Sequence, residues 1–276
     1  MFSLRRSIIE NAALSRLKVT KQIAAICVVS LLTLGHLYSG PPALGWDVVL
    51  VPLLFAIAGW ALRGVSITGA IAGGILAFIF YSAAGWKMFA LLFVVFCLTW
   101  LATRAGRKNK MSLGLAESKK GRSASQVASN LIVTACALVF LDGILGVSAA
   151  LVLATAALAE AAADTVSSEI GQAYAGLTYL ITNLQPVSPG TNGGLSLIGT
   201  GAGMISAALV SWAAYYLVLG RSSFWLCVIA AVSGMMMDSL LGATLERKQL
   251  LKNDSVNFFG TLSAAAIAWL LAPLLL

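Results

Sequence analysis

Four carboxylates occur inside or at the edge of apolar segments: Glu160, Asp164, Glu169 and Asp238. An ionised side chain at membrane depth is costly, so such residues generally face a polar cavity or an opposite charge. Glu160 and Asp164 are four residues apart and share one face of a helix, where their charges repel. A divalent cation such as Mg²⁺, which prefers carboxylate oxygens, would offset this repulsion. A buried hydrogen-bonded network with one neutral acid is the alternative explanation.

The other two acids are less tightly specified by their surroundings. Asp238 lies near one end of an apolar segment, where it could add an oxygen donor beside Asp164, cap the helix or pair with Arg247. Glu169 points away from Asp164 unless the helix ends there, and Gly171 favours an ending nearby. We expect Asp164, Glu169 and Asp238 to be catalytic, and these three with Glu160 to bind the metal.

A basic segment precedes one of the apolar segments and could bind phosphate. Lys120 and Arg122 lie just before an expected helix, and Asn130 lies one turn after Gln126 on the same face. Basic groups at a helix N-terminus favour phosphate binding. A run of positive charge is more often a solvated loop on the cytoplasmic side of a membrane protein.

Two uncharged or weakly charged segments could contribute further ligand contacts. The segment 190–196 contains Thr191, Asn192, Gly193 and Gly194, whose backbone N–H groups could form an anion-binding nest. An ordinary connecting turn is the alternative. The segment 253–257 contains Asn253, Asp254 and Asn257: the first two could cap a helix, whereas Asn257 lies within an apolar span and needs a polar partner.

The elements that must position these residues are membrane helices. The chain has 276 residues, is 59% hydrophobic and 10% charged, and has a mean hydropathy of +0.92, which indicates an all-α, polytopic membrane helix bundle. We expect a basic cytoplasmic arm (1–21) and one membrane domain (22–276), with the chemistry-bearing part at about 104–261. About nine transmembrane helices are predicted: 22–39, 46–62, 66–84, 86–103, 126–141, 145–163, 196–218, 223–243 and 256–275.

The distribution of Lys and Arg sets the expected orientation. With the N-terminus in the cytoplasm, 16 of the 18 basic residues fall on the inside, and only Lys87 and Arg221 fall outside. The polar segments 104–130, 164–194 and 238–257 then reach the same side. They could build one site facing the cytoplasm at the inner surface of the cell membrane. The single histidine, His36, and four scattered cysteines give little support to zinc binding, disulfides or His-based catalysis.

These segments, in this order, resemble the integral membrane family that includes plant phytyl-phosphate kinase and animal transmembrane protein nineteen. The resemblance covers roughly residues 121–261. Its pieces are Gly121-Arg122 with Gln126-Val127 and Asn130, Ala163-Asp164-Thr165 with Ser168-Glu169-Ile170-Gly171, Gly190 to Gly194 with Ser196, Asp238-Ser239 with Gly242-Ala243, and Asn253-Asp254 with Val256-Asn257-Phe258 and Gly260-Thr261.

The resemblance implies a Mg²⁺-dependent kinase that phosphorylates a membrane isoprenyl monophosphate to the diphosphate, using CTP or another nucleoside triphosphate. On this hypothesis Lys120 and Arg122 bind the triphosphate with backbone N–H groups near Asn192–Gly194, and Asn130, Asn192 and Asn257 orient the phosphates or the base. The expected partners are the nucleotide, the isoprenyl phosphate and membrane lipid, with no nucleic acid. A cytidylyltransferase that forms a CDP-lipid and an ion-coupled transporter are the alternative functions.

Overall fold

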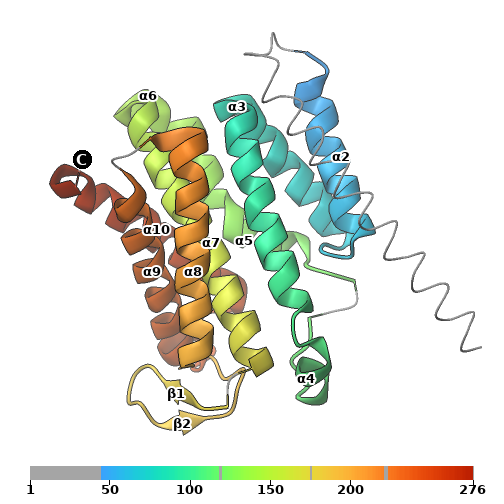
Figure 1. Ribbon diagram of the computed structural model, residues 1–276, viewed down its shortest axis with the longest axis vertical. Helices are drawn as coiled ribbons and strands as arrows, with labels where there is room; N and C mark the ends of the chain where they lie inside the picture. The colour runs from blue at the N-terminus through green and yellow to red at the C-terminus, as the bar shows by residue number, and fades with distance from the viewer. Residues whose placement is uncertain (1–44, 118–119, 175, 221–222, 276) are drawn as a thin grey trace, which may run out of the picture.

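The computed structural model describes residues 45–117, 120–174, 176–220 and 223–275. The predicted basic arm (1–21) and the predicted span 22–39 lie outside these residues. The helices are α2 (Asp47–Ala61), α3 (Ile67–Arg104), α4 (Arg107–Ser112), α5 (Ala124–Cys136), η1 (Ala137–Leu141), α6 (Asp142–Leu145), α7 (Val147–Tyr174), α8 (Leu197–Ala214), η2 (Tyr215–Leu219), α9 (Phe224–Leu241), η4 (Gly242–Glu246) and α10 (Asn253–Leu275) (Figure 1).

Within the described residues, six helical segments are long and apolar enough to cross a membrane, so the predicted count of about nine is not confirmed. The helix α2 is apolar but only 15 residues long. The predicted spans 66–84 and 86–103 form the single element α3, which is interrupted at Gly85, where φ is 72°. Glycine tolerates this left-handed geometry. The two halves of α3 fold back on one another, because Gly69 and Thr103 from its opposite ends line one cavity (Figure 1).

The observed boundary between the helices predicted at 126–141 and 145–163 lies later in the sequence than expected. We expected a break at Asp142-Gly143, but helical structure continues through both residues to Leu145. The chain turns at Gly146, where φ is 83°. The helix ending that Gly171 favoured lies three residues later, because α7 continues through Glu169 and Gly171 to Tyr174.

The helix α7 is the central element of the bundle and contacts α3, α5, α8, α9 and α10. Seven alanines between Ala154 and Ala163 are buried, and such small residues let neighbouring helix backbones approach closely. At Gly203 of α8, a Cβ atom would lie 2.8 Å from Ser167 Cβ and 2.9 Å from the carbonyl oxygen of Ala163. This close packing fixes the position of the acidic residues on α7.

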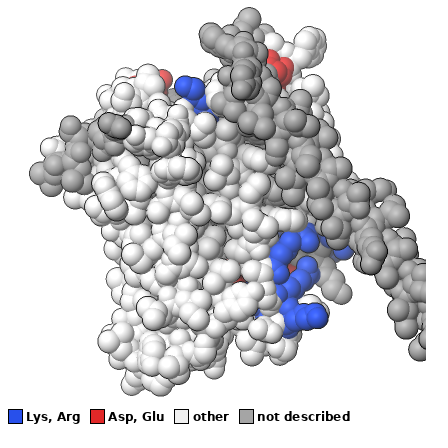
Figure 2. Space-filling view, in the orientation of Figure 1, with Lys and Arg blue, Asp and Glu red and all other residues white. Residues whose placement is uncertain are grey.

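The outer surface of the bundle is apolar over much of its height. Large side chains such as Ile71, Ile75, Trp212 and Leu270 are exposed, as expected of a lipid-facing surface. In Figure 2, uncharged residues cover most of the visible face, and Lys and Arg gather low on the right, beside the lower end of α3. Most of the basic side chains visible in this view therefore lie at one end of the bundle, and a few charged side chains lie at the other.

A small antiparallel sheet joins α7 to α8, which the all-α prediction did not include. Its strands are β1 (Thr178–Leu180), β2 (Pro186–Val187) and β3 (Gly194–Leu195), in the order β2-β1-β3. Thr178 pairs with Val187, and Leu180 pairs with Gly194. The sheet holds the glycine-rich segment at the end of the bundle (Figure 1).

Candidate active site

A polar cavity of about 290 Å³ lies at the end of the bundle beside the sheet. We call it the acid cavity. It brings together residues from all five polar segments singled out in the sequence. The predicted site residues that line it are Arg122, Asn130, Asp164, Glu169, Thr191, Asn192, Gly193, Gly194, Asp238, Asn253 and Asn257. The expectation that these segments converge is therefore confirmed.

The carboxyl groups of Asp164 and Asp238 line this cavity together, and their negative charges lie close enough to interact. Asp164 belongs to α7 and Asp238 to α9, so the pair joins two helices. Arg122 lines the same cavity and brings a positive charge to Asp164, and its Nη1 donates a 3.4 Å hydrogen bond to Thr165 Oγ1. Glu246 adds a further negative charge close to both aspartates.

Glu160 lies one helical turn beneath this pair, fully buried and outside the cavity lining. Two glycines make room for it. A Cβ atom at Gly234 would lie 2.7 Å from Glu160 Cγ, and a Cβ atom at Gly260 would lie 2.6 Å from Glu160 Oε1 and 3.3 Å from Asp238 Oδ2. Neither of these two oxygens has a hydrogen-bond partner within the part of the chain that the structure describes. An ionised carboxylate with an unpaired buried oxygen is costly, so each group favours either a ligand or its neutral form.

Glu169 has a different environment from the one we predicted. Its Oε2 accepts a 2.5 Å hydrogen bond from Lys110 Nζ, and its Oε1 accepts a 2.8 Å bond from Thr103 Oγ1. Lys110 is 0% exposed and also donates to the carbonyl oxygens of Ala102 and Thr103. Glu169 is thus buried, its charge is neutralised by Lys110, and its contacts connect α7 to the α3–α4 segment.

The predicted set of four metal-binding acids is not gathered around one point. In residues 45–275, leaving out the gaps, no group of three or more His, Cys, Asp or Glu side chains could hold one ion. The physical reason is that Glu169 is committed to Lys110 and Glu160 lies below the cavity floor. Asp164 and Asp238 are the pair that the fold brings together.

The glycine-rich segment covers the acid cavity through close backbone packing. Gly193 has φ of 75°, and a Cβ atom there would collide with Ala243 of η4. Thr191 Oγ1 donates a 2.7 Å bond to the carbonyl oxygen of Ser188, and Gly194 N donates a 2.8 Å bond to that of Thr191. The missing side chain at Gly193 therefore lets this segment lie against the turn that follows Asp238.

The remaining predicted residues divide into two groups. Lys120 and Asp254 do not line the acid cavity, whereas Asn253 and Asn257 do. Asn130 lines it, although its Nδ2 donates a 2.8 Å bond to the carbonyl oxygen of Gln126 in its own helix. The structure thus places the amides of α10 at the cavity and leaves two of the predicted charged groups outside it.

Sequence reasoning missed Lys110, Thr103 and Glu246. Lys110 stands within a basic run that we interpreted as a solvated loop, and Glu246 lies beside Arg247 in a segment that looked like an ordinary helix end. No spacing pattern in the sequence distinguishes a buried lysine from its solvent-exposed neighbours. Thr103 could have been suspected from its position at the polar end of an apolar span.

The chain belongs to the integral membrane protein DUF92 family, whose family model matches residues 50–265. The suspected family is confirmed. The chain is 33% identical over 204 residues to the uncharacterized membrane protein MJ0933 of Methanocaldococcus jannaschii, covering 74% of this chain and 84% of the relative.

Two further relatives come from photosynthetic organisms. The membrane protein sll0875 of Synechocystis is 33% identical over 201 residues, covering 70% of this chain and 77% of the relative. The chloroplastic protein VTE6 of Arabidopsis thaliana is 29% identical over 224 residues, covering 78% and 67% respectively. No solved structure matches the chain.

Proposed function

We propose that this chain is a membrane-embedded kinase that transfers a phosphoryl group from a nucleoside triphosphate to an isoprenyl monophosphate such as phytyl phosphate. CTP is the expected donor by analogy with related polyprenol kinases. The observation that carries the proposal is the pair Asp164–Asp238 beside Arg122, in a polar cavity at the end of a membrane helix bundle. Membership of a family that includes plant phytyl-phosphate kinase supports the reaction class.

Asp164 and Asp238 fit a Mg²⁺ ion by the chemistry of their donors. Mg²⁺ is usually held by one or two carboxylates together with substrate phosphates, rather than by a closed protein cage. The unpaired Oδ2 of Asp238 is an oxygen available for such an ion. When bound, Mg²⁺ would neutralise charge on the phosphates of the nucleotide. We leave Glu169 out of this donor set because Lys110 already neutralises it.

The reaction itself requires two anions to meet. An oxygen of the acceptor monophosphate forms a bond to the γ-phosphorus, while the bond from that phosphorus to the bridging oxygen of the β-phosphate breaks. The nucleoside diphosphate leaves with the electron pair. The acceptor oxygen is already ionised, so no general base is needed and catalysis consists mainly of positioning and charge neutralisation.

The residues around the acid cavity divide these tasks. Arg122, at the junction with a second cavity described below, would hold the phosphate that is transferred, because a guanidinium matches phosphate geometry. The backbone N–H groups of Asn192 and Gly193 and the side-chain amides of Asn253 and Asn257 would orient the nucleotide. We expect this site to face the cytoplasm, where nucleotides are supplied, because the distribution of Lys and Arg favours that orientation.

Product analysis tests the proposal. The full chain, purified into lipid nanodiscs, is given CTP labelled in the γ-phosphate, Mg²⁺ and a panel of isoprenyl monophosphates. We expect a labelled isoprenyl diphosphate and unlabelled CDP. Release of pyrophosphate with formation of a CDP-lipid would instead identify a cytidylyltransferase, and nucleotide-independent flux into sealed vesicles would identify a transporter.

A further inference from the structure

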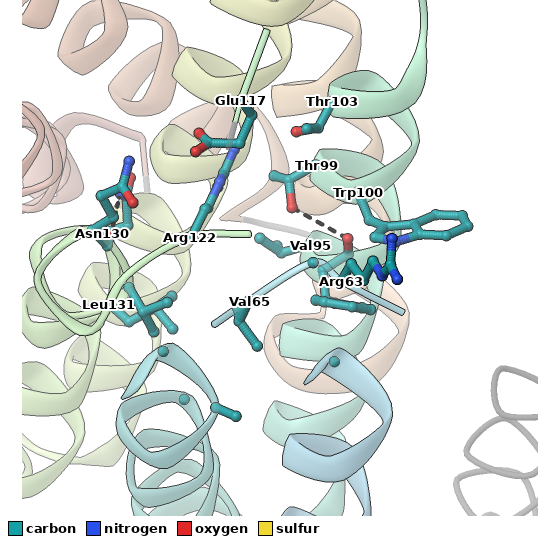
Figure 3. A pocket seen from close by; sticks show the side chains of 18 of the residues that line it. Arg63, Val65, Val95, Thr99, Trp100, Thr103, Glu117, Arg122, Asn130 and Leu131 are labelled. Atoms are coloured by element: carbon teal, nitrogen blue, oxygen red, sulfur yellow. Dashed lines mark hydrogen bonds between the residues drawn. The ribbon is translucent and has the colours of Figure 1, made fainter. Parts of the chain in front are cut away.

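A second cavity of about 110 Å³ lies between α2, α3 and α5, next to the acid cavity. We call it the arginine cavity. Its interior is apolar and includes Phe55, Leu92, Val95, Phe96 and Leu131. Figure 3 shows Val65, Val95 and Leu131 on its walls, with Arg63 beside Trp100 and with Arg122 next to Glu117. Nothing in the proposed reaction at the acid cavity accounts for an apolar hollow that ends in arginines.

The lining of the arginine cavity changes from apolar to basic along α3 and along α2. On α3, Leu92, Phe96, Trp100 and Arg104 follow one another at intervals of four residues and line the cavity as one stripe. This stripe extends about 18 Å from the leucine to the arginine, at 1.5 Å per residue. On α2, the parallel series runs from Phe55 through Gly59 to Arg63 just beyond the helix end.

Positive charge dominates the basic end of the arginine cavity. Arg63, Arg104, Arg107 and Arg122 line it, and Glu117 is the one acid among its lining residues. Arg104 lies close enough to Arg63 and Arg107 for their charges to repel. Among the residues that the structure describes, no carboxylate forms an ion pair with Arg63, Arg104 or Arg107. An anion bound here would relieve their mutual repulsion.

The two cavities meet at Arg122. Glu117, Arg122, Gln126 and Asn130 line both. The backbone holds Arg122 in place: its N–H donates a 3.1 Å bond to the carbonyl oxygen of Gly64, and its own carbonyl oxygen accepts a 2.9 Å bond from Ser66 N. A phosphate at this junction would therefore lie at the wall shared with the cavity that Asp164 and Asp238 line.

We propose that the arginine cavity is the binding site for the isoprenyl monophosphate acceptor. The hydrocarbon chain lies among the apolar side chains of α2, α3 and α5, and the phosphate lies at the arginine end beside Arg122. This inference rests on the proposed kinase function and deepens it by separating the lipid site from the nucleotide site.

The apolar end of the cavity offers a path for a long hydrocarbon chain. Ala56 and Ala70 line the arginine cavity and also line an apolar groove between α2 and the first half of α3. The groove is formed by Leu53, Ile57, Trp60, Ile71, Ile75 and Phe78, among others. A chain that exceeds the cavity would leave through this groove toward the lipid.

Photolabelling tests the site independently of catalysis. A C20 isoprenyl monophosphate with a diazirine in its chain is bound to the full protein in nanodiscs without nucleotide, and the labelled peptides are identified. We expect labels on the cavity-facing residues of α2, α3 and α5, displaced by unlabelled C20 monophosphate and not by CTP. Equal displacement by phosphatidic acid would show that the cavity binds phospholipid headgroups instead. Labels spread over all lipid-facing helices would overturn the proposal.

A matched pair of glycine variants tests the same point in solution kinetics. A Cβ atom at Gly73 would meet only Val127, at 3.7 Å, so Gly73→Leu fills the cavity without a backbone clash. Gly201 on α8 has nothing within 4 Å of a Cβ position and does not line either cavity, so Gly201→Leu is the control. We expect Gly73→Leu to raise the KM for the isoprenyl phosphate about tenfold or more and to leave the KM for CTP within about twofold.

These readouts separate the two proposals. Site-specific photolabelling without any diphosphate product would support the lipid site and contradict the kinase. Diphosphate formation with an unchanged acceptor KM in Gly73→Leu would support the kinase and contradict the lipid site. Gly201→Leu is expected to match the unmodified protein in both assays, and to show that a bulky residue on a membrane helix is tolerated.

Discussion

The acid cavity and the arginine cavity share a wall but are built in different ways. The acid cavity collects polar side chains and backbone from five segments that are far apart in the sequence. The arginine cavity is formed by the apolar faces of three helices and carries charge only near one end. The first suits a compact, highly charged ligand, and the second suits a long molecule with one charged end. One small bundle can therefore hold two dissimilar substrates in contact.

The wall between the cavities depends on the buried ion pair Lys110–Glu169. Thr103, which donates to Glu169, lines the arginine cavity, whereas Glu169 lines the acid cavity. Lys110→Met leaves a buried carboxylate without its partner, and we expect a loss of about 3–5 kcal/mol in stability. Thermal unfolding in detergent measures this. The double variant Lys110→Met/Glu169→Leu should recover much of the loss, and an undiminished stability of the single variant would contradict this role.

The acid pair should affect catalysis without affecting the lipid site. Asp238→Asn removes one charge from the pair, and we expect the rate of diphosphate formation to fall about 10²–10³-fold. Photolabelling of the arginine cavity should remain as in the unmodified protein. Asp142→Asn is the control, because Asp142 is exposed on α6 and lies outside both cavities. Full activity of Asp238→Asn with CTP would exclude the carboxylate from the reaction.

Changes in the glycine-rich segment should affect the binding of the nucleotide and leave the binding of the isoprenyl phosphate unchanged. Gly193→Ala introduces a Cβ atom against Ala243 at a residue with φ of 75°, so we expect a cost of about 1–3 kcal/mol and a raised KM for CTP. Gly146→Ala carries similar backbone strain, with φ of 83° and nothing within 4 Å of the Cβ position. If both variants raise the KM for CTP equally, the contact with Ala243 does not position the nucleotide.

The smallest effect is expected at the rim of the arginine cavity. The double variant Arg63→Gln/Arg107→Gln removes two partly exposed charges, each worth about 0.2–1 kcal/mol. We expect the KM for the isoprenyl phosphate to rise up to about tenfold and to become less sensitive to salt. Lys108→Gln removes an adjacent exposed charge that lines neither cavity and serves as the control. An identical response of both proteins would place the phosphate elsewhere.

The convergence of the site was predictable because the motif residues are polar and their segments are joined by helices of spanning length. The proximity of Asp164 and Asp238 was predicted for two reasons. An ionised side chain is costly at membrane depth, and the alternating direction of the predicted spans puts both residues on the same side of the membrane. The division of α3 at Gly85 was predicted, because the expected spans 66–84 and 86–103 end on either side of it. The break at Gly146 was less accessible, because glycine is common within membrane helices and only its backbone conformation reveals a turn.

The sequence by itself determined that the chain is a helical membrane protein with acids at one end of its bundle, since apolar length and charge position are readable without coordinates. Only the tertiary structure decided the partners of individual charges. Lys110 is buried while Lys108 is exposed, although they stand two residues apart in one basic run. Likewise, Arg63 and Arg104 gather at one cavity because α3 folds back on itself. Burial depends on what other segments place around a residue, and its own neighbours in the sequence do not carry that information.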